Sequence, residues 1–289
     1  VAARLQEQGR DGDVVLGEST RRLVATRVTL ASLGSVTLKG RAEAVAVYRL
    51  VSLEPPAGAA ATPFVGRDAE LARLAAVLDA AVAMPAARLA VLLGSPGLGK
   101  SRLIDEFSRR YAAAATILTA HCDAAGGTTF APLGEALRAH LGLEDGAAGD
   151  PVRSTVAAAL PTSTDEGERA RVSSGVAALL AGSPAAPEET FLVIRRFLAG
   201  LAATKPVVLV IDDLHWAEPL LLDLVEHLVQ WGSGVPLLVL VGARPELRDA
   251  RSSLASPGGV VADVVMLGGL DAGAAMRLAA NVIGATDLP

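Results

Sequence analysis

Residues 94–101 read Gly94-Ser95-Pro96-Gly97-Leu98-Gly99-Lys100-Ser101, and this stretch decides the fold. It is the complete G-x-x-x-x-G-K-[ST] pattern, in which glycines let successive backbone N–H groups turn toward one anion. The pattern predicts that these eight residues, with Arg102 after them, lie against the phosphates of a nucleotide. Lys100 is then expected to supply positive charge to the outer phosphates, and Ser101 to offer its hydroxyl to Mg²⁺. The alternative is a glycine-rich turn that binds nothing.

The residues on either side of this loop favour the nucleotide site. Residues 89–93 form an apolar run of strand length just before it. After it, apolar residues recur at the spacing of one helix face: Leu103, Ile104, Phe107 and Tyr111. A loop between a strand and a helix adds the dipole of the helix N-terminus to the attraction for phosphate.

Two further strand ends carry charged residues. The apolar run 207–211 is followed by Asp212 and Asp213, and the run 237–243 is followed by Arg244. In a parallel sheet these ends share one edge with a phosphate-binding loop. We therefore expect Asp212 to hold Mg²⁺, Asp213 to orient the attacking water, and Arg244 to reach the terminal phosphate. The alternatives are a solvated Asp-Asp turn and a solvent-facing arginine.

Composition narrows the function classes. A net charge of −5 and a pI near 5.5 argue against a nucleic-acid-binding face within these 289 residues. The longest apolar runs fall short of the roughly 20 residues that span a bilayer, so no membrane partner is expected. The single cysteine, Cys122, favours a cytoplasmic location. Although His121 precedes it, we expect a buried thiol rather than a zinc site.

The chain divides into three parts. Residues 1–53 contain turns and short strands and are too few for a comfortable core of their own, so a partial α+β segment is expected. Residues 54–62 are a Pro/Gly/Ala linker. In residues 63–289 strands alternate with helices, which indicates an α/β domain with a parallel sheet covered on both faces. Asp68 is expected to cap its first helix. Because the first residue is Val and the sequence starts as if within a domain, we expect a fragment of a longer polypeptide.

Residues 63–289 resemble the nucleotide-binding domain of the STAND branch of P-loop ATPases, close to AAA+ proteins. Four segments carry the resemblance: Phe64-Val65-Gly66-Arg67-Asp68, the Walker A loop 94–101, Asp212-Asp213-Leu214-His215-Trp216-Ala217-Glu218, and Gly242-Ala243-Arg244-Pro245-Glu246. The resemblance implies a P-loop NTPase sheet of strand order 5-1-4-3-2, with ATP and Mg²⁺ as cofactors. It places Val65, Gly66 and Arg67 near the adenine or the phosphates, and makes Arg244 a sensor of the γ-phosphate.

The match has two departures from the family pattern. Asp213 stands where most AAA+ proteins carry Glu, and its shorter arm suits a slow switch better than a fast motor. The winged-helix lid expected after this domain is missing from residues 63–289.

Residues 1–53 resemble the C-terminal end of a class III nucleotide cyclase domain. The matching pieces are Val1-Ala2-Ala3-Arg4-Leu5, residues 12–20, and residues 38–41 leading to 47–50. The resemblance implies that Arg4 stabilises the cyclisation transition state, with the other catalytic groups upstream.

Three functions follow from these resemblances. The first is an ATP-dependent signalling switch linked to a cyclase, with possible self-association through both domains. The second is cyclic AMP synthesis, which only the full-length protein could perform. The third is a transcriptional regulator or scaffold that binds ATP without turnover.

Overall fold

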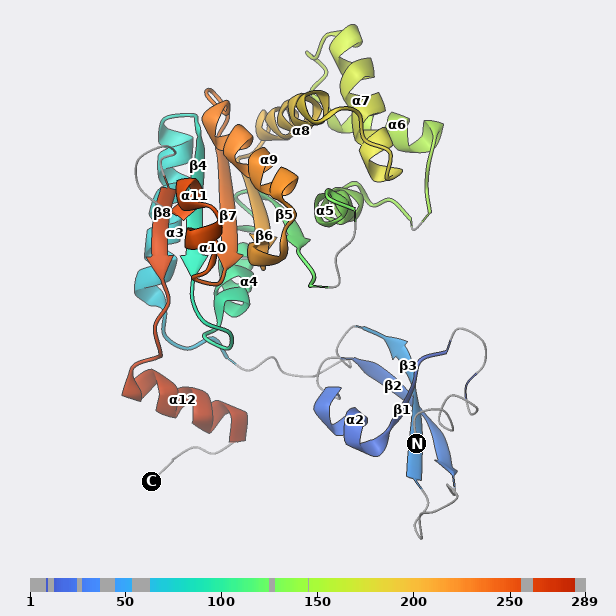
Figure 1. Ribbon diagram of the computed structural model, residues 1–289, viewed down its shortest axis with the longest axis vertical. Helices are drawn as coiled ribbons and strands as arrows, with labels where there is room; N and C mark the ends of the chain where they lie inside the picture. Colours follow the sequence, from blue (N-terminus) through green and yellow to red (C-terminus); the bar gives the residue numbers. More distant parts are fainter. Residues whose placement is uncertain are drawn as a thin grey trace. The chain divides into compact units, whose positions relative to one another are not determined.

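The computed structural model describes residues 9, 13–24, 28–36, 45–53, 63–124, 128–144, 146–255 and 262–283. The chain divides into two compact units, Val1–Pro63 and Phe64–Pro289. Each unit has a sheet of its own (Figure 1). The expected linker at 54–62 and the cyclase-like Arg4 lie outside the described residues.

The first unit contains a three-stranded antiparallel sheet of order β1-β3-β2. Its strands are β1 (Val15–Gly17), β2 (Thr29–Val36) and β3 (Val45–Ser52), and helix α2 (Glu18–Val24) contacts β3. Glu18 links helix and sheet, because its carboxylate accepts hydrogen bonds from Arg21 and from the Tyr48 hydroxyl at 2.9 Å. A partial α+β segment with strands was expected here, but its helix at residues 18–24 was not located from the sequence.

The second unit contains a five-stranded sheet of order β5-β6-β7-β4-β8. Every pair of neighbouring strands is parallel. The strands are β4 (Ala87–Leu93), β5 (Thr116–His121), β6 (Val207–Asp212), β7 (Leu237–Ala243) and β8 (Ala262–Met266). Counted along the chain and read from β8, the order is 5-1-4-3-2, as the resemblance implies. The α/β fold expected from alternating strands and helices is confirmed.

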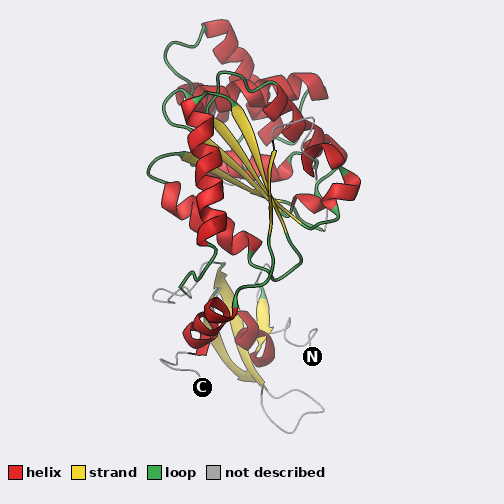
Figure 2. Cartoon of the chain, turned by 90° about the vertical axis from the view of Figure 1, so that its left-hand side faces the viewer, coloured by secondary structure: helices red, strands yellow, loops and turns green. Residues whose placement is uncertain are grey.

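Helices cover both faces of this sheet (Figure 2). Successive side chains of a strand point to opposite faces, so each buried strand serves two cores. On β4, Ala90 and Leu92 pack with α3 (Asp68–Ala83) and α4 (Lys100–Tyr111). Leu89, Val91 and Leu93 pack into the core on the other face. The helices of that face are α5 (Ala131–Leu141), α6 (Asp150–Ala159), α7 (Glu166–Leu180), α8 (Pro187–Ala202) and α9 (Pro219–Gln230).

Short elements complete the unit. A 3₁₀ turn, η1 (Leu214–Trp216), follows β6, and α10 (Leu247–Ala250) and α11 (Ser252–Ala255) follow β7. The last helix is α12 (Ala272–Ile283). In the part of the chain that the structure describes, every helix is too short or too polar to cross a membrane.

The predicted cap of α3 is wrong by one residue. Asp68 is the first residue of the helix, and Arg67 occupies the cap position without a side-chain hydrogen bond to the helix backbone. Gly66 and Arg67 both have left-handed backbones, with φ of 70° and 66°. These two residues turn the chain one position earlier than the capping preference of Asp indicates.

Candidate nucleotide-binding site

Loop 94–101 connects β4 to α4 at the carboxyl end of the sheet. Gly97 and Gly99 have φ of 82° and 88°, in the region where side chains are disfavoured. A Cβ atom at either position would meet nothing within 4 Å. The need for glycine there is therefore conformational rather than steric. Gly99 is also the cap residue of α4 and, having no side chain, makes no capping hydrogen bond to the first turn of the helix.

Lys100 folds back over its own loop. Its Nζ donates hydrogen bonds to the carbonyl oxygens of Gly94 at 2.8 Å and Ser95 at 3.3 Å. The side chain is buried, and these carbonyls satisfy a charge that would otherwise be costly to bury. The loop is anchored in turn to β7, because the Gly94 N–H donates to the carbonyl of Ala243 at 3.2 Å.

Asp212 ends β6 and is only 2% exposed. Its Oδ1 accepts a hydrogen bond from the N–H of Asp213 at 2.9 Å. The neighbouring strand β7 leaves room for this carboxylate through Gly242, where a Cβ atom would stand 2.3 Å from Asp212 Oδ1. On the other side, the charge of Asp212 helps to raise the pKa of Asp105 on α4, after burial as the larger cause. Asp212 therefore lies close both to β7 and to α4, the helix that follows the loop.

These donors suit a small hard cation. The Ser101 hydroxyl and the Asp212 carboxylate are oxygen ligands of the kind Mg²⁺ prefers. Among the described residues, no group of three or more His, Cys, Asp or Glu side chains is arranged to hold a metal ion. A cation at this edge would thus take few ligands from the protein, as Mg²⁺ does when phosphates and water supply the rest.

Asp213 follows with a left-handed backbone, φ 54° and ψ 35°, and a half-exposed side chain. Its Oδ1 lies 3.8 Å from Nδ1 of His215, a buried side chain for which no described residue provides a hydrogen-bond partner to either ring nitrogen. Burial lowers the pKa of His215, and the nearby positive charges of Arg244 and Lys100 lower it further, although Asp213 opposes them. A neutral imidazole beside a carboxylate is the expected state at neutral pH.

Arg244 lies directly after β7, next to the turn that contains His215. Its guanidinium carbon is 5.2 Å from the ring centroid of Trp216, in cation–π contact. The Trp216 ring in turn contacts the His215 ring, with centroids 4.9 Å apart. Sequence reasoning assigned no role to His215 or Trp216.

The segment from Val65 to Arg67 reaches the loop from the start of α3. Arg67 donates to Glu70 at 2.8 Å, to the carbonyl of Leu98 within the loop at 3.4 Å, and to the carbonyl of Gly268. Gly66 is confined as well, since a Cβ atom there would be 3.2 Å from Ala274 of α12. Arg67 therefore joins the loop to the chain after β8, and no local sequence pattern signals this link.

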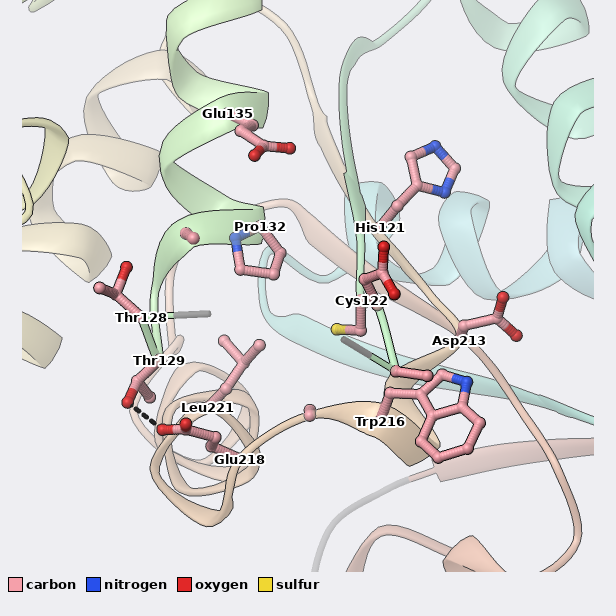
Figure 3. A pocket seen from close by; sticks show the side chains of 14 residues that line it. His121, Cys122, Thr128, Thr129, Pro132, Glu135, Asp213, Trp216, Glu218 and Leu221 are labelled. Atoms are coloured by element: carbon pink, nitrogen blue, oxygen red, sulfur yellow. Dashed lines mark hydrogen bonds between the residues drawn. The ribbon is translucent and has the colours of Figure 1, made fainter. Parts of the chain in front are cut away.

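Beside Asp213 lies a cavity of about 560 Å³ that sequence analysis did not predict. It opens between the end of β5, the start of α5 and the segment after β6 (Figure 3). Trp216 and Asp213 line one part of it, and Glu135 and the hydrogen-bonded pair Thr129–Glu218 line another. Cys122 also borders it, and burial raises the pKa of its thiol to about 11, with the Asp213 and Asp212 charges adding to the effect. The prediction of a buried thiol is confirmed.

The structure thus brings most of the predicted residues to one edge of the sheet. Loop 94–101, Asp212, Asp213 and Arg244 stand at the carboxyl ends of β4, β6 and β7, which are neighbours. Arg67 meets the loop through Leu98. Arg102 lies exposed on the first turn of α4.

Comparison with known proteins gives a family match over residues 63–240, to a model described as "AAA ATPase domain". An uncharacterised protein of Rhizobium meliloti is 26% identical over 276 residues, which cover 89% of this chain and 26% of that protein. The chain therefore spans about a quarter of the length of this curated relative.

Two solved structures are similar in fold. One is a STAND protein with a tetratricopeptide repeat sensor from Pyrococcus horikoshii, with a TM-score of 0.42 and 17% identity, covering 78% of this chain and 26% of that one. The other is Cdc6p from Pyrobaculum aerophilum, with a TM-score of 0.41 and 16% identity, covering 72% of this chain and 48% of that one.

Proposed function

Because the chain belongs to the AAA ATPase domain family, we propose that residues 63–289 bind Mg²⁺ and ATP at loop 94–101 and hydrolyse the nucleotide slowly. One observation supports this most strongly. The buried Asp212 ends β6, and the carbonyl-bound Lys100 follows the loop after β4, so that both lie at the carboxyl edge of the sheet with only β7 between their strands. At this edge a lysine and an acid can serve one triphosphate.

We assign the following roles to the residues of the site. The N–H groups of the loop and Lys100 bind the phosphates. Ser101 and Asp212 hold Mg²⁺, which when bound neutralises charge on the outer phosphates. Asp213 accepts a hydrogen bond from the attacking water and orients it. Arg244 binds the γ-phosphate by its planar fork of donors.

Two features of Asp213 support slow turnover. Its side chain is half exposed, so bulk water competes with the attacking water for hydrogen bonds to its carboxylate. Its left-handed backbone fixes the direction of the short aspartate side chain, which limits how far the carboxylate can reach. A slow hydrolytic step suits a switch whose two nucleotide states persist long enough to be read by a partner.

The binding step is tested by comparing Lys100→Ala with wild-type protein in calorimetric titrations with ATP. Loss of a charged hydrogen-bond donor costs roughly 1.5–3 kcal/mol, so we expect affinity to fall by about 10- to 100-fold. The matched control is Lys205→Ala, because Lys205 is exposed and, among the described residues, donates to the carbonyl of Ala113 alone, just after α4. Equal ATP affinity in wild-type and Lys100→Ala proteins would exclude the proposed site.

A measurement of ATP hydrolysis distinguishes the hydrolysing switch from a regulator or scaffold that only binds ATP. Phosphate release from bound ATP supports a hydrolysing switch, whereas tight binding with no release over many hours favours a regulator or scaffold that only binds ATP. Self-association, which the resemblance implies, is tested by size-exclusion chromatography with and without ATP: a shift to larger size with ATP supports it, and elution as a monomer in both conditions contradicts it.

The link to a cyclase rests on the resemblance of residues 1–53 alone, and the matched family begins at residue 63. In the longer protein we propose that the nucleotide state of the ATPase domain controls cyclic AMP synthesis. Cyclic AMP production by the full-length protein that responds to Lys100→Ala supports this link, and production that ignores the substitution contradicts it.

A further inference from the structure

The side chain of Arg244 has one described partner, and it is aromatic. The guanidinium carbon lies 5.2 Å from the Trp216 ring centroid. Among the described residues, Arg244 forms no ion pair with a carboxylate and no side-chain hydrogen bond. A guanidinium within about 6 Å of an indole face is attracted by the ring quadrupole. Among the described residues, the contact with Trp216 is therefore the one specific interaction of this cation.

Trp216 is suited to hold a cation that must later leave. It ends the turn that begins beside Asp213, and 44% of the residue is exposed, at the edge of the cavity (Figure 3). A cation–π contact at such an exposed site is weak. By contrast, a guanidinium bound to a phosphate by two charged hydrogen bonds is held strongly. A bound triphosphate would therefore draw the guanidinium of Arg244 away from the Trp216 ring.

We infer that Trp216 is a positioning residue that retains Arg244 on its ring until the γ-phosphate of ATP takes the guanidinium away. The inference rests on the proposed function, because it needs a triphosphate at loop 94–101. ADP lacks the phosphate that competes, so Arg244 stays on Trp216 when ADP is bound. The indole face at the cavity then differs between the two nucleotide states, and a partner at the cavity could read that difference.

The contact itself is tested without nucleotide. Trp216 and Trp231 are the two tryptophans of the chain, so Trp231→Phe leaves Trp216 as the sole indole emitter. Adding Arg244→Ala to this variant is expected to shift the emission maximum or intensity of the free protein. Adding Arg248→Ala, which removes an exposed arginine four residues along, is the matched control and is expected to change nothing. Identical spectra for the Arg244→Ala and Arg248→Ala proteins would overturn the inference.

The competition between the Trp216 ring and the γ-phosphate for Arg244 is tested by comparing the affinities for an ATP analogue and for ADP. In Trp216→Ala, Arg244 no longer has to leave a ring, so affinity for a non-hydrolysable ATP analogue should rise about 2- to 5-fold while ADP affinity stays constant. Trp216→Phe keeps an aromatic face and should stay close to wild type, and thermal unfolding checks that each variant is folded. An equal loss of affinity for both nucleotides means a structural role and contradicts the inference. A selective loss for the ATP analogue means that Trp216 presents Arg244 to the phosphate, and contradicts it too.

The emission of Trp216 gives an independent readout in the Trp231→Phe protein. The ATP analogue should change it and ADP should not, and Arg244→Ala should abolish the difference. If wild-type protein binds neither nucleotide, the proposed function is wrong, and the γ-phosphate cannot compete with Trp216 for Arg244. The nucleotide-free spectra would still decide whether Arg244 rests on Trp216, so the two failures are distinguishable.

Discussion

Replacing Gly242 by alanine should displace Asp212 without touching the phosphate-binding loop. Gly242 lies in β7, which pairs with β4 on one side and β6 on the other, so its backbone has little freedom to move. The new Cβ atom would stand 2.3 Å from Asp212 Oδ1 and 2.9 Å from Cδ1 of Ile104. Ordinary contact begins near 3.4 Å, so the carboxylate must move by about 1 Å.

The size of the effect follows from this displacement. Overpacking of a buried site costs about 1–3 kcal/mol of unfolding free energy. A displacement of about 1 Å in a group that positions the reaction costs roughly 10²-fold in kcat. Lys100 and the loop glycines are unchanged, so ATP affinity in the absence of Mg²⁺ should stay near wild type. The loss should therefore appear in Mg²⁺-dependent turnover.

The assay combines phosphate release with ATP titrations in Mg²⁺ and in EDTA. The control is Gly134→Ala in α5, where the added Cβ meets Leu179 and Leu180 only at 3.7 and 3.8 Å. That variant should gain about 0.5–1 kcal/mol from higher helix propensity and keep its turnover. A folded Gly242→Ala protein with wild-type Mg²⁺-dependent turnover would refute the placement of Asp212 at the metal.

Three further predictions concern other parts of the domain. Asp213→Asn should reduce phosphate release by roughly 10²- to 10⁴-fold with little change in ATP affinity, and equal turnover in single-turnover assays would remove Asp213 from the mechanism. Arg67→Lys lacks the guanidinium that bonds Glu70 through Nη1 and the carbonyls of Leu98 and Gly268 through Nη2, so urea unfolding should show a loss of about 1–3 kcal/mol; an unchanged midpoint would contradict this. Burial lowers the pKa of His227 below its ordinary value of 6.5, with Arg195 adding to the effect. The unfolded chain therefore binds the proton first as the pH falls, and stability should decline below about pH 6.5, with a shallower slope in His227→Phe.

The sequence predicted the loop and the strand ends because their signals are local. The pattern at 94–101, the apolar runs before Asp212 and Arg244, and the helix after the loop each occupy a few consecutive residues. Sheet order required the family resemblance, since alternation of strands and helices fits several orders. The contact between Arg67 and Gly268 joins residues 201 positions apart, and the Trp216–Arg244 contact depends on two adjacent strand ends. Such pairs follow from topology rather than from residue type.

The strand order itself explains why a residue that touches no ligand limits the geometry of the site. The loop leaves β4 and the acid ends β6, but β7 runs between these two strands. Residue 242 therefore stands against both the carboxylate of Asp212 and the helix that follows the loop, through Ile104. Any side chain there would widen the gap that Ser101 and Asp212 have to close around one cation. It follows that the metal-binding half of the site should fail in graded steps as residue 242 grows from Gly to Ala to Val, while the phosphate-binding half stays intact. Parallel loss of ATP affinity in EDTA along that series would mean that the two halves are not separable in this way.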